Sequence, residues 1–336
     1  MRILLVGHSL LSPWTDYTHR ALSRLGHSVE QFYCTSLLLD RLTLFGDKDP
    51  TAKGPGSGSR LQGLRNRWHH WRDQRLLRAA RSLRPDLILV LWGNTLSPEL
   101  LRSLKKENGA RLATWWVDDP FRHQAEKLIP LYDHFFIFDR SYIAPLQKQG
   151  AQNVRFLPCA CDESVYFPRR LSRREQARYA SDVALVAWCY PNRARVAQAL
   201  AGMDLKIWGR GWVTPSAEQD RFVRDEVAAK IYSATKIGLN IHSDQTRDGG
   251  LNTRTFELLA AGTFQITDAV GGMEDLLEPG LEVAVYRSPE EARSLVEHYL
   301  KHPEERMRMA EAGHRRVLAQ HTYLHRMKAL MAEVET

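Results

Sequence analysis

Short, almost continuously apolar runs alternate with amphipathic stretches in the first half of the chain. Runs of this length and composition suit strands of a parallel sheet that is covered on both faces. The predicted strands are Arg2–Gly7, Ser28–Phe32, Leu87–Leu91, Arg111–Val117 and His134–Phe138. Helical patterns lie between them, at Thr15–Leu25 and Ser97–Glu107 for example. The alternation predicts a doubly wound α/β domain with its ligand at the carboxyl ends of the strands.

The same alternation returns in the second half. The predicted strands there are Asp182–Ala187, Asp204–Trp208, Ile237–Ile241, Phe264–Thr267 and Val283–Tyr286. Pro168 and the charged run after it indicate a linker near residues 160–178. We therefore expect two domains, at residues 1–165 and 175–318, followed by amphipathic helices that run to residue 336.

Composition limits the classes of protein to which the chain can belong. Its 336 residues are enough for two domains of ordinary size, and 43% hydrophobic with 26% charged residues is normal for a globular protein. No apolar run approaches the length of a membrane-spanning helix. The spacing of Cys34, Cys159, Cys161 and Cys189 suits neither a zinc site nor a disulfide framework, which predicts a cytoplasmic location. The net charge of +8 indicates anionic partners.

Residues 252–262 read as a capped helix that ends at a glycine. Asn252 is a good N-cap, and Phe256 and Leu259 lie at helical spacing on an apolar face. Gly262 occupies the position at which helices commonly end in a left-handed residue. A short apolar strand follows directly.

The start of this helix has the chemistry of a nucleotide site. It lies behind Gly249-Gly250, a turn that allows close approach, and a helix N-terminus can bind phosphate. Arg254 and Glu257 are three residues apart and share the polar face. A carboxylate one turn into the helix can accept two hydroxyl hydrogen bonds, as a ribose offers. The other interpretation of Glu257 is a solvated acid on a helix face.

The run Arg254-x-x-Glu257-x-x-x-Ala261-Gly262 resembles the donor-nucleotide site of GT-B glycosyltransferases. The chain is most similar to the CgeB-like group, whose members carry an N-x-R-x-F-E-x-x-A-x-G run and two later motifs. Those motifs correspond here to Gly280–Tyr286 and His321–Tyr323. The resemblance covers residues 180–330 well and the first half loosely.

The resemblance implies two Rossmann-like domains that face each other across a cleft, with the helix of residues 319–336 crossing back onto the first. It places the donor on the second domain and the acceptor on the first. The donor would be a UDP-, GDP- or dTDP-linked sugar, with no separate cofactor. Glu257 would hold the ribose, and the helix start at Asn252, Thr253 and Arg254 would face the diphosphate. The chain departs from retaining relatives at Gly249, where they carry a first glutamate.

Loops of the second domain supply further donor candidates. Arg193 begins a helix after one strand and Arg210 follows the next, so both are candidates to neutralise the diphosphate. Gly209 allows close backbone approach, and a tryptophan beside it can stack on a nucleobase. Asn240 and His242 end a strand that points towards the same cleft as Glu257. Each candidate also has a competing interpretation. Arg193 can be a solvent-facing arginine, the loop at Gly209 a plain tight turn, and His242 a structural histidine.

Acceptor and catalytic candidates in the first domain also follow strands. His8 comes after the first strand, and Asp118-Asp119 ends the fourth. Each can act as a base or contact the acceptor. The alternatives are a hydrogen-bonded turn histidine and a helix N-cap at Asp119. We expect no metal, because the acids are adjacent rather than in a D-x-D pattern and no third ligand is evident.

An arginine-rich segment, Arg60–Arg84, has tryptophans interleaved at helical spacing. Its arginines are Arg60, Arg65, Arg67, Arg72, Arg75, Arg78, Arg81 and Arg84, opposed only by Asp73. One interpretation is an amphipathic core helix with a solvated basic face. The other is a surface for an anionic acceptor or for peripheral contact with the inner face of a membrane.

The sequence thus predicts a metal-independent glycosyltransferase that uses a nucleotide-diphosphate sugar and an unidentified acceptor. A nucleotide-sugar epimerase on the same fold is the enzyme alternative. A basic nucleic-acid-binding protein is the non-enzyme alternative, but no nucleic-acid motif is evident and no specific nucleic acid is expected.

Overall fold

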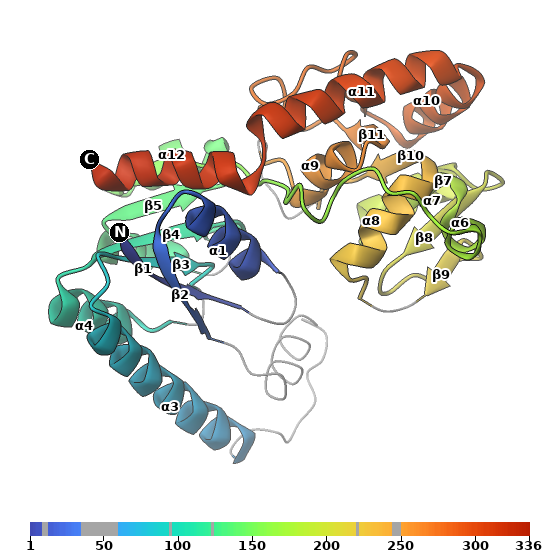
Figure 1. The fold of residues 1–336 in the computed structure, drawn as a ribbon. Helices are drawn as coiled ribbons and strands as arrows, with labels where there is room; N and C mark the ends of the chain where they lie inside the picture. The colour runs from blue at the N-terminus through green and yellow to red at the C-terminus, as the bar shows by residue number, and fades with distance from the viewer. Residues whose placement is uncertain (9–12, 35–59, 94–95, 122–123, 220–221, 244–249) are drawn as a thin grey trace. The chain divides into compact units, whose positions relative to one another are not determined.

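The computed structural model describes residues 1–8, 13–34, 60–93, 96–121, 124–219, 222–243 and 250–336 (Figure 1). The chain divides into two compact units. Unit 1 comprises Met1–Ile137, Ile143–Leu157 and Met327–Thr336, and unit 2 comprises Phe138–Tyr142 and Pro158–Arg326. Gly249 and the side chains of Arg60 and Arg65 lie outside the description. Among the described helices, none combines the length and apolarity that crossing a membrane would need.

Unit 1 is built on a parallel six-stranded sheet of order β2-β1-β3-β4-β5-β6. The strands are β1 Arg2–Gly7, β2 Ser28–Tyr33, β3 Leu87–Leu91, β4 Arg111–Trp116, β5 His134–Ile137 and β6 Val154–Phe156. Every residue of β3 is buried, as the apolar runs predict for a sheet covered on both faces. The edge strand β6 escaped prediction because it has only three residues, one of them the exposed Arg155.

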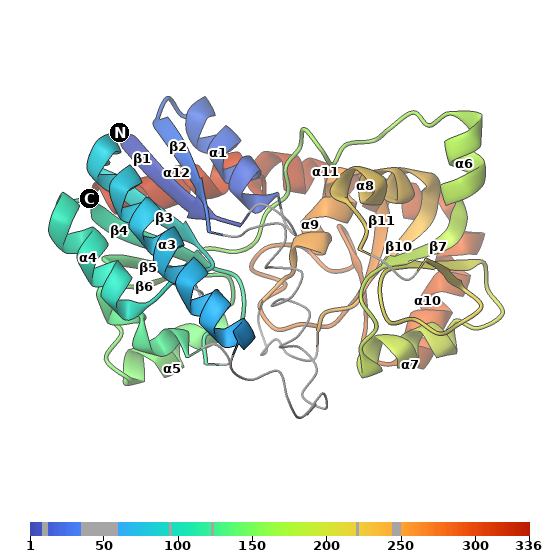
Figure 2. The same cartoon turned by 90° about the horizontal axis from the view of Figure 1, so that it is seen from below.

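Helices cover both faces of this sheet. They are α1 Trp14–Arg24, α3 Arg60–Leu83, α4 Pro98–Asn108, α5 Ile143–Lys148 and the later turns of α12 Tyr323–Glu335. Helices α1 and α12 lie on one face, and α3 and α4 lie on the other (Figures 1 and 2). Local signals set the ends of α4: Ser97 Oγ accepts a hydrogen bond from the backbone N of Leu100, and Gly109 ends the helix with a φ of 63°.

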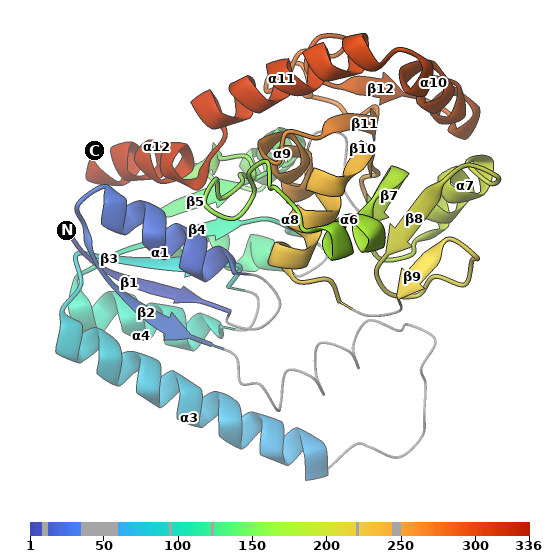
Figure 3. The same cartoon turned by 45° about the vertical axis from the view of Figure 1, so that its right-hand side comes forward.

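Unit 2 has a second parallel sheet of six strands, in the order β12-β11-β10-β7-β8-β9 (Figure 3). Its strands are β7 Ser181–Val186, β8 Leu205–Trp208, β9 Ala217–Gln219, β10 Thr235–Asn240, β11 Phe264–Asp268 and β12 Ala284–Tyr286. The edge strand β9 was not predicted and is again only three residues long. The two sheets confirm the predicted α/β fold of two doubly wound domains.

The helices of unit 2 are distributed over both faces of its sheet. They are α6 Arg173–Tyr179, α7 Pro191–Ala199, α8 Asp225–Ala234, α9 Thr253–Ala260, α10 Pro289–Lys301 and α11 Pro303–Gln320. Apolar residues of α7 and α10 pack with alternate strand residues in one core. The chain runs outwards from β7 to β8 and in the opposite direction from β10 to β11. Right-handed crossovers therefore place α9 on the face opposite α7.

The boundary between the units differs from the expected one. Unit 1 ends at Leu157 rather than at residue 165, and α6 occupies part of the expected linker. The physical reason is pairing with the late chain: the backbone N of Cys161 donates to the carbonyl oxygen of His321 (3.2 Å), and the N of Tyr323 donates to that of Cys161 (3.0 Å). The Arg326 guanidinium also donates to Pro158 O at 2.9 Å. The first turn of α12 therefore belongs to unit 2, and only residues from Met327 onwards belong to unit 1.

Candidate functional site

The strand order of unit 2 reverses between β7 and β10, and ligands of such sheets bind at the carboxyl edge beside this reversal. Two side chains at the start of α7 join the two strand ends. Asn192 Nδ2 donates to the carbonyl oxygen of His242 at 2.8 Å. Arg193 Nε donates to that of Ile241 at 3.0 Å. The loops at the reversal are therefore held together by side-chain hydrogen bonds.

Arg193 is buried, with 6% of its surface exposed, so it is not the solvent-facing arginine of the alternative interpretation. Its Nη1 donates to Trp188 O at 3.0 Å, and the guanidinium lies 4.9 Å from the centre of the Tyr190 ring. Because the Arg193 guanidinium is buried and donates hydrogen bonds to backbone carbonyls, it places a desolvated positive charge at the edge of the sheet. Whether it also reaches a diphosphate stays a prediction.

The start of α9 is organised by Asn240, a residue of β10. Asn240 Oδ1 accepts from Asn252 Nδ2 (3.1 Å) and from Arg254 Nη1 (3.2 Å), and Asn240 Nδ2 donates to Thr255 Oγ1 (2.9 Å). Asn252 Oδ1 accepts from the backbone N of Thr255 at 3.0 Å, which confirms its N-cap role. Asn240 has no exposed surface, so it does not open into a cleft as expected. Its amide is used to position Arg254 and the helix start.

Two glycines of the site are required by close contacts. A Cβ on Gly250 would lie 2.4 Å from Cε2 of Phe138. A Cβ on Gly209 would lie 2.0 Å from the carbonyl oxygen of Ala187, and its φ of +147° disfavours a side chain as well. In both cases the close approach is to another part of unit 2, so approach of a ligand to these two glycines stays a prediction. The other half of the predicted turn, Gly249, lies outside the described residues.

Glu257 does not face solvent as a simple helix-face acid. The residue is half-buried, and its carboxyl accepts hydrogen bonds from the hydroxyls of Thr253 and Tyr166. Burial, and next the charge of Asp225, raise the pKa of Glu257 to about 8, although Arg254 opposes this shift. The alternative interpretation, a solvated acid, is wrong because this face of α9 lies near Tyr166 and the start of α8. Tyr166 and Asp225 were missed as neighbours of Glu257 because neither residue lies in a recognisable motif.

A pair formed by the buried His242 and the half-buried Asp268 joins the ends of β10 and β11. His242 Nδ1 lies 2.7 Å from Asp268 Oδ1, and the backbone N of His242 donates to both carboxylate oxygens at 3.0 and 3.1 Å. Burial alone would raise the pKa of Asp268, but the hydrogen bonds from His242 outweigh it and lower that pKa. Asp268 was missed, although a polar residue at the end of a buried strand is a recognisable signal.

The pair defines the chemistry that His242 can offer. Nδ1 is used by Asp268, so Nε2 is the ring nitrogen left for another partner. His242 is only 2% exposed, and its Nε2 has no hydrogen-bond partner among the residues that the structure describes. A buried polar atom without a partner is costly in a folded protein and indicates a place for a ligand or water.

The segment His321–Tyr323, near the end of the chain, begins the part of the structure that packs against Phe256 of α9. The His321 ring lies 5.2 Å from that of Phe256, and the Arg326 guanidinium lies 5.8 Å from the same ring. Arg326 Nη2 donates to His321 Nδ1 (2.7 Å), which leaves the proton on Nε2 for Leu276 O (2.9 Å). Burial and then the Arg326 charge lower the pKa of His321 to about 3. The motif at His321–Tyr323 and the motif on α9 therefore meet where the neutral, buried His321 packs against Phe256.

The tryptophans beside Gly209 do not have the expected role. Trp208 and Trp212 are 1% and 5% exposed, and Trp212 Nε1 donates to Ala187 O at 2.7 Å. They pack inside the unit, which makes base stacking on them unavailable. The half-buried Trp188 at the end of β7 is instead the aromatic residue of this edge, with the Arg210 guanidinium 5.9 Å from its ring.

Unit 1 has its own reversal of strand order, between β1 and β3, and His8 lies there. The His8 ring lies 5.5 Å from that of Trp92, and its Nε2 lies 3.3 Å from Trp92 O. Burial lowers the pKa of His8; the Trp92 carbonyl opposes this, and the charge of Arg72 adds to it. The lowered pKa favours the neutral imidazole, which is the state that a general base requires.

Asp118 and Asp119 lie after β4 at the same carboxyl edge as His8. Asp118 Oδ1 accepts from the backbone N of Asp119 (2.8 Å), and Asp119 Oδ1 accepts from that of Phe121 (2.9 Å). Both residues are half-buried. Asp119 shapes a turn here and caps no α-helix, so the N-cap alternative is wrong.

Helix α3 combines the two interpretations of the arginine-rich segment. Leu76, Leu77 and Ala80 are buried on its inner face, and Arg72 is buried as well, paired with Asp73. Three arginines of the outer face, Arg67, Arg75 and Arg78, are exposed and pair with no acid among the described residues. Trp71 is 51% exposed, and the Arg75 guanidinium lies 4.7 Å from its ring.

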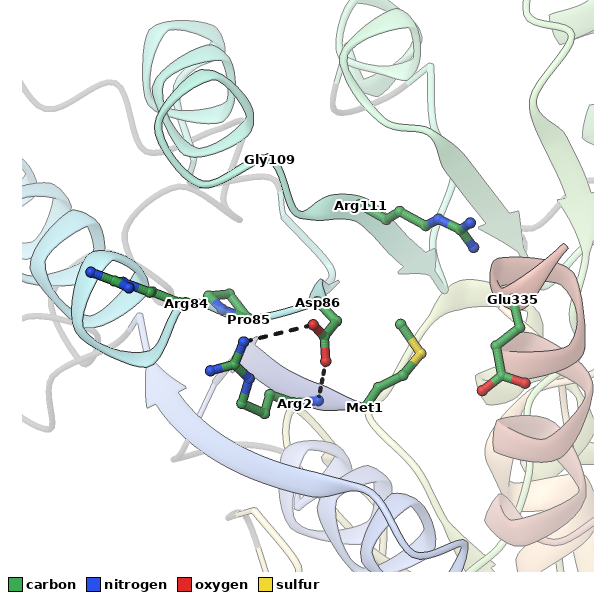
Figure 4. A pocket seen from close by; sticks show the side chains of 8 residues that line it. All are labelled: Met1, Arg2, Arg84, Pro85, Asp86, Gly109, Arg111 and Glu335. Carbon is green, nitrogen blue, oxygen red and sulfur yellow. Dashed lines mark hydrogen bonds and ion pairs between the residues drawn. The ribbon is translucent and has the colours of Figure 1, made fainter.

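A cavity of about 510 Å³ in unit 1 lies away from these candidates (Figure 4). It is lined by Met1, Arg2, Arg84, Pro85, Asp86, Gly109, Arg111 and Glu335. Arg2 and Asp86 pair within it, as Figure 4 shows. These residues begin strands or end helices, so the cavity lies at the amino edge of the sheet, opposite His8 and Asp118.

Comparison with solved structures identifies the fold. The fold matches a sucrose-phosphate synthase from Thermosynechococcus elongatus with a TM-score of 0.68 at 14% identity, covering 100% of this chain and 98% of that one. It matches Anabaena HepE, solved in complex with UDP and glucose, with a TM-score of 0.67 at 11% identity, covering 100% and 99%. The chain has the GT-B fold.

Sequence comparison adds two similarities to known glycosyltransferase-like and CgeB sequences. Residues 193–332 match the family described as glycosyl transferase-like. The spore protein CgeB of Bacillus subtilis is 21% identical over 265 residues, which are 72% of this chain and 80% of CgeB. These matches and the fold support a CgeB-like glycosyltransferase, as the motifs predicted. A putative UDP-N-acetylglucosamine 2-epimerase from Listeria monocytogenes is also similar in fold, with a TM-score of 0.61 at 10% identity and coverage of 99% and 95%.

Proposed function

We propose that the protein transfers a sugar from a nucleotide-diphosphate donor, UDP-, GDP- or dTDP-linked, to an acceptor. The observation that carries this proposal is the start of α9, where Asn240 holds Arg254 beside Glu257 next to the strand reversal of unit 2. This segment lies inside the region that matches the glycosyltransferase family. The binding of UDP and UDP-glucose by HepE, a protein of the same fold, supports a nucleotide-sugar donor.

The donor would lie along the carboxyl edge of unit 2. Glu257 accepts hydrogen bonds from the ribose hydroxyls in place of those from Thr253 and Tyr166. The N-terminus of α9, with Arg254, faces the diphosphate, and Arg193 and Arg210 add positive charge. Stabilising negative charge on the departing diphosphate is the main catalytic task when the bond between sugar and phosphate breaks.

His242 is our candidate for contact with the transferred sugar or its phosphate. Asp268 orients the imidazole through Nδ1, and Nε2 is the atom left for the ligand. On unit 1, His8, Asp118 and Asp119 lie along one sheet edge and are the candidates to bind the acceptor or take its proton.

No divalent metal is required for transfer in this proposal, because arginines and a helix N-terminus supply the positive charge. Transfer measured in EDTA should therefore match transfer in manganese or magnesium. Complete loss of transfer in EDTA, with recovery on adding either metal, would contradict this.

A panel of nucleoside diphosphates tests the donor site. A ligand at about 100 times its Kd stabilises the folded protein by about 2.7 kcal/mol, which a thermal-shift assay detects easily. We expect one base to raise the Tm and the matching nucleotide sugar to be hydrolysed or transferred. No shift with UDP, GDP or dTDP would contradict a donor site on unit 2.

An epimerase is the second candidate, because the Listeria protein named as one shares the fold. It predicts that a nucleotide sugar alone is converted to its epimer. Incubating the donor without acceptor and analysing the nucleotide sugars separates the two functions, since a transferase leaves the configuration of the intact donor unchanged.

For the acceptor we propose an anionic molecule or membrane surface at the outer face of α3. The exposed Arg67, Arg75 and Arg78 give charge complementarity, and Trp71 is an aromatic residue of the kind found at membrane interfaces. The location that suits this proposal is the cytoplasm, with peripheral contact at the inner membrane surface.

A further inference from the structure

The turn between α10 and α11 brings together three metal-ligating side chains. His298 lies in the last turn of α10, His302 is the residue between the two helices, and Glu305 lies in the first turn of α11. Their ligating atoms all lie within 4.8 Å of one another. His298 Nε2 is 2.9 Å from Glu305 Oε2, and the two imidazole rings stack with centroids 4.1 Å apart.

The hydrogen bond of His302 prepares its ring for a metal. Its Nδ1 lies 2.7 Å from the carbonyl oxygen of His298, and a carbonyl can only accept, so Nδ1 carries the proton. Nε2 is then the ring nitrogen left for a metal. Metal-ligating histidines characteristically donate their second ring nitrogen to a carbonyl or carboxylate in this way.

The turn is also held in shape from both sides. His302 precedes Pro303, and a residue before proline has a restricted backbone. Arg306 Nη1 donates to the carbonyl oxygen of Tyr299 at 2.6 Å, and the His298 ring packs edge-on against the Tyr299 ring. The three ligands are therefore carried by backbone that is already ordered, which lowers the entropy lost on binding.

We propose that His298, His302 and Glu305 bind a divalent transition-metal ion of the Zn²⁺ class, with water completing the coordination. Two imidazoles and one carboxylate suit Zn²⁺, which is commonly held by histidine nitrogen and glutamate oxygen. Ca²⁺ and Mg²⁺ prefer sites made entirely of oxygen and are not expected. The ion replaces the proton shared between His298 and Glu305. Both histidines are exposed, so the ion enters directly from solvent.

The position of this site assigns it a structural role. Helix α10 follows β12 and runs back along the sheet, so its last turn lies at the amino edge of the strands, away from Glu257 and His242. Arg306, one residue after Glu305, lines a cavity together with Lys236 and Phe264 from the starts of β10 and β11. A metal here joins α10 to α11. This inference is independent of the proposed transferase activity.

Calorimetry of untagged, metal-free protein with Zn²⁺ near pH 7.5 tests the inference, with Mg²⁺ as the comparison ion. We expect one saturable Zn²⁺ site, weaker by at least about tenfold in His302→Gln and in Glu305→Gln, since loss of even an outer-shell partner costs about that much. The matched control is His70→Gln, which removes an exposed histidine of unit 1.

Circular dichroism shows whether each variant is folded, and Co²⁺ provides a spectroscopic check through its visible absorption. The proposal is overturned if wild-type protein shows no saturable Zn²⁺ binding. It is equally overturned if His302→Gln and Glu305→Gln bind Zn²⁺ as tightly as His70→Gln does.

Discussion

Glu257 is the residue on which the proposed donor site depends most. In a ribose complex, at a pH above the raised Glu257 pKa of about 8, the ionised carboxylate would accept two hydroxyl hydrogen bonds, each contributing about 1.5–3 kcal/mol before non-additivity. About 3 kcal/mol in total corresponds to roughly a hundredfold in affinity.

We therefore expect Glu257→Ala to weaken binding of the preferred nucleoside diphosphate roughly a hundredfold by calorimetry. Glu226→Ala, which removes an exposed acid at the start of α8, is the matched control and should bind normally. A folded Glu257→Ala protein with wild-type affinity would remove Glu257 from the site.

The raised pKa of Glu257 gives a second prediction, on stability. The folded-state pKa of about 8 lies above the ordinary 4.5, so the stability from the protonated acid is complete below about 4.5 and lost as pH rises through about 8. The substitution Glu257→Gln places a neutral amide there, which mimics the protonated acid at every pH. In urea unfolding at about pH 5, 7 and 9, Glu257→Gln should gain stability relative to wild type as pH rises. A difference that does not change with pH would refute the raised pKa.

At the scale of elements, α3 illustrates how one helix serves two purposes. Its inner face packs in unit 1, whereas its outer face carries arginines with no acidic partner among the described residues. Arg72 belongs by sequence to the basic series, yet it is 2% exposed and paired with Asp73 at 2.6 Å. Reversing the charge of Arg72 would therefore test the folding of unit 1 and not the binding of an acceptor.

The double variant Arg75→Glu/Arg78→Glu is the appropriate test of the acceptor role. It should weaken acceptor use, seen as a raised KM for acceptor, and leave nucleotide affinity unchanged, because α3 belongs to unit 1 and the proposed donor site to unit 2. Arg81→Glu is a useful comparison, since Arg81 already pairs with Glu107 at 2.8 Å. Loss of nucleotide affinity with normal acceptor kinetics would reverse the assigned roles of the units.

Helix α9 shows why motif residues are not all ligand contacts. In the N-x-R-x-F-E run, Asn252 caps the helix, Arg254 and Glu257 belong to the polar side, and Phe256 is enclosed by His321 and Arg326. His321 packs against this helix beside Arg326. Burial and the charge of Arg326 lower the pKa of His321, which keeps the histidine neutral. The spacing of the motif thus combines ligand chemistry with packing.

At the scale of the whole molecule, the end of the chain belongs to the unit in which the chain begins. Met327, Leu330 and Val334 are fully buried on α12 within unit 1. Burying three such side chains contributes roughly 1.5–3 kcal/mol each, a large share of the stability of a domain.

Deleting residues 327–336 should therefore destabilise unit 1, although most of unit 2 separates this segment from the rest of unit 1 in the sequence. Limited proteolysis, with the fragments identified by mass, would show faster cleavage within residues 1–157. The matched control is Lys328→Ala, which alters only the exposed face of α12 and should leave cleavage unchanged. An untouched unit 1 after the deletion would contradict the prediction.

The sequence by itself determined the two series of strands and helices, because burial on both faces of a parallel sheet demands continuous apolar runs. It also determined the cap at Asn252 and the resemblance to the CgeB-like group, both of which depend on local spacing. The edge strands β6 and β9 escaped prediction because three residues are too few to show a period.

Tertiary structure alone decided which polar residues share an environment. The pairing of His242 with Asp268, the contact of Tyr166 and Asp225 with Glu257, and the burial of Arg72 and Arg193 were all invisible to local spacing. Side-chain burial and partner distance set the pKa and the accessibility of such groups, and both depend on elements that meet only in the fold. For that reason local spacing left a solvated acid open as an alternative for Glu257, and only packing against other elements made the residue half-buried.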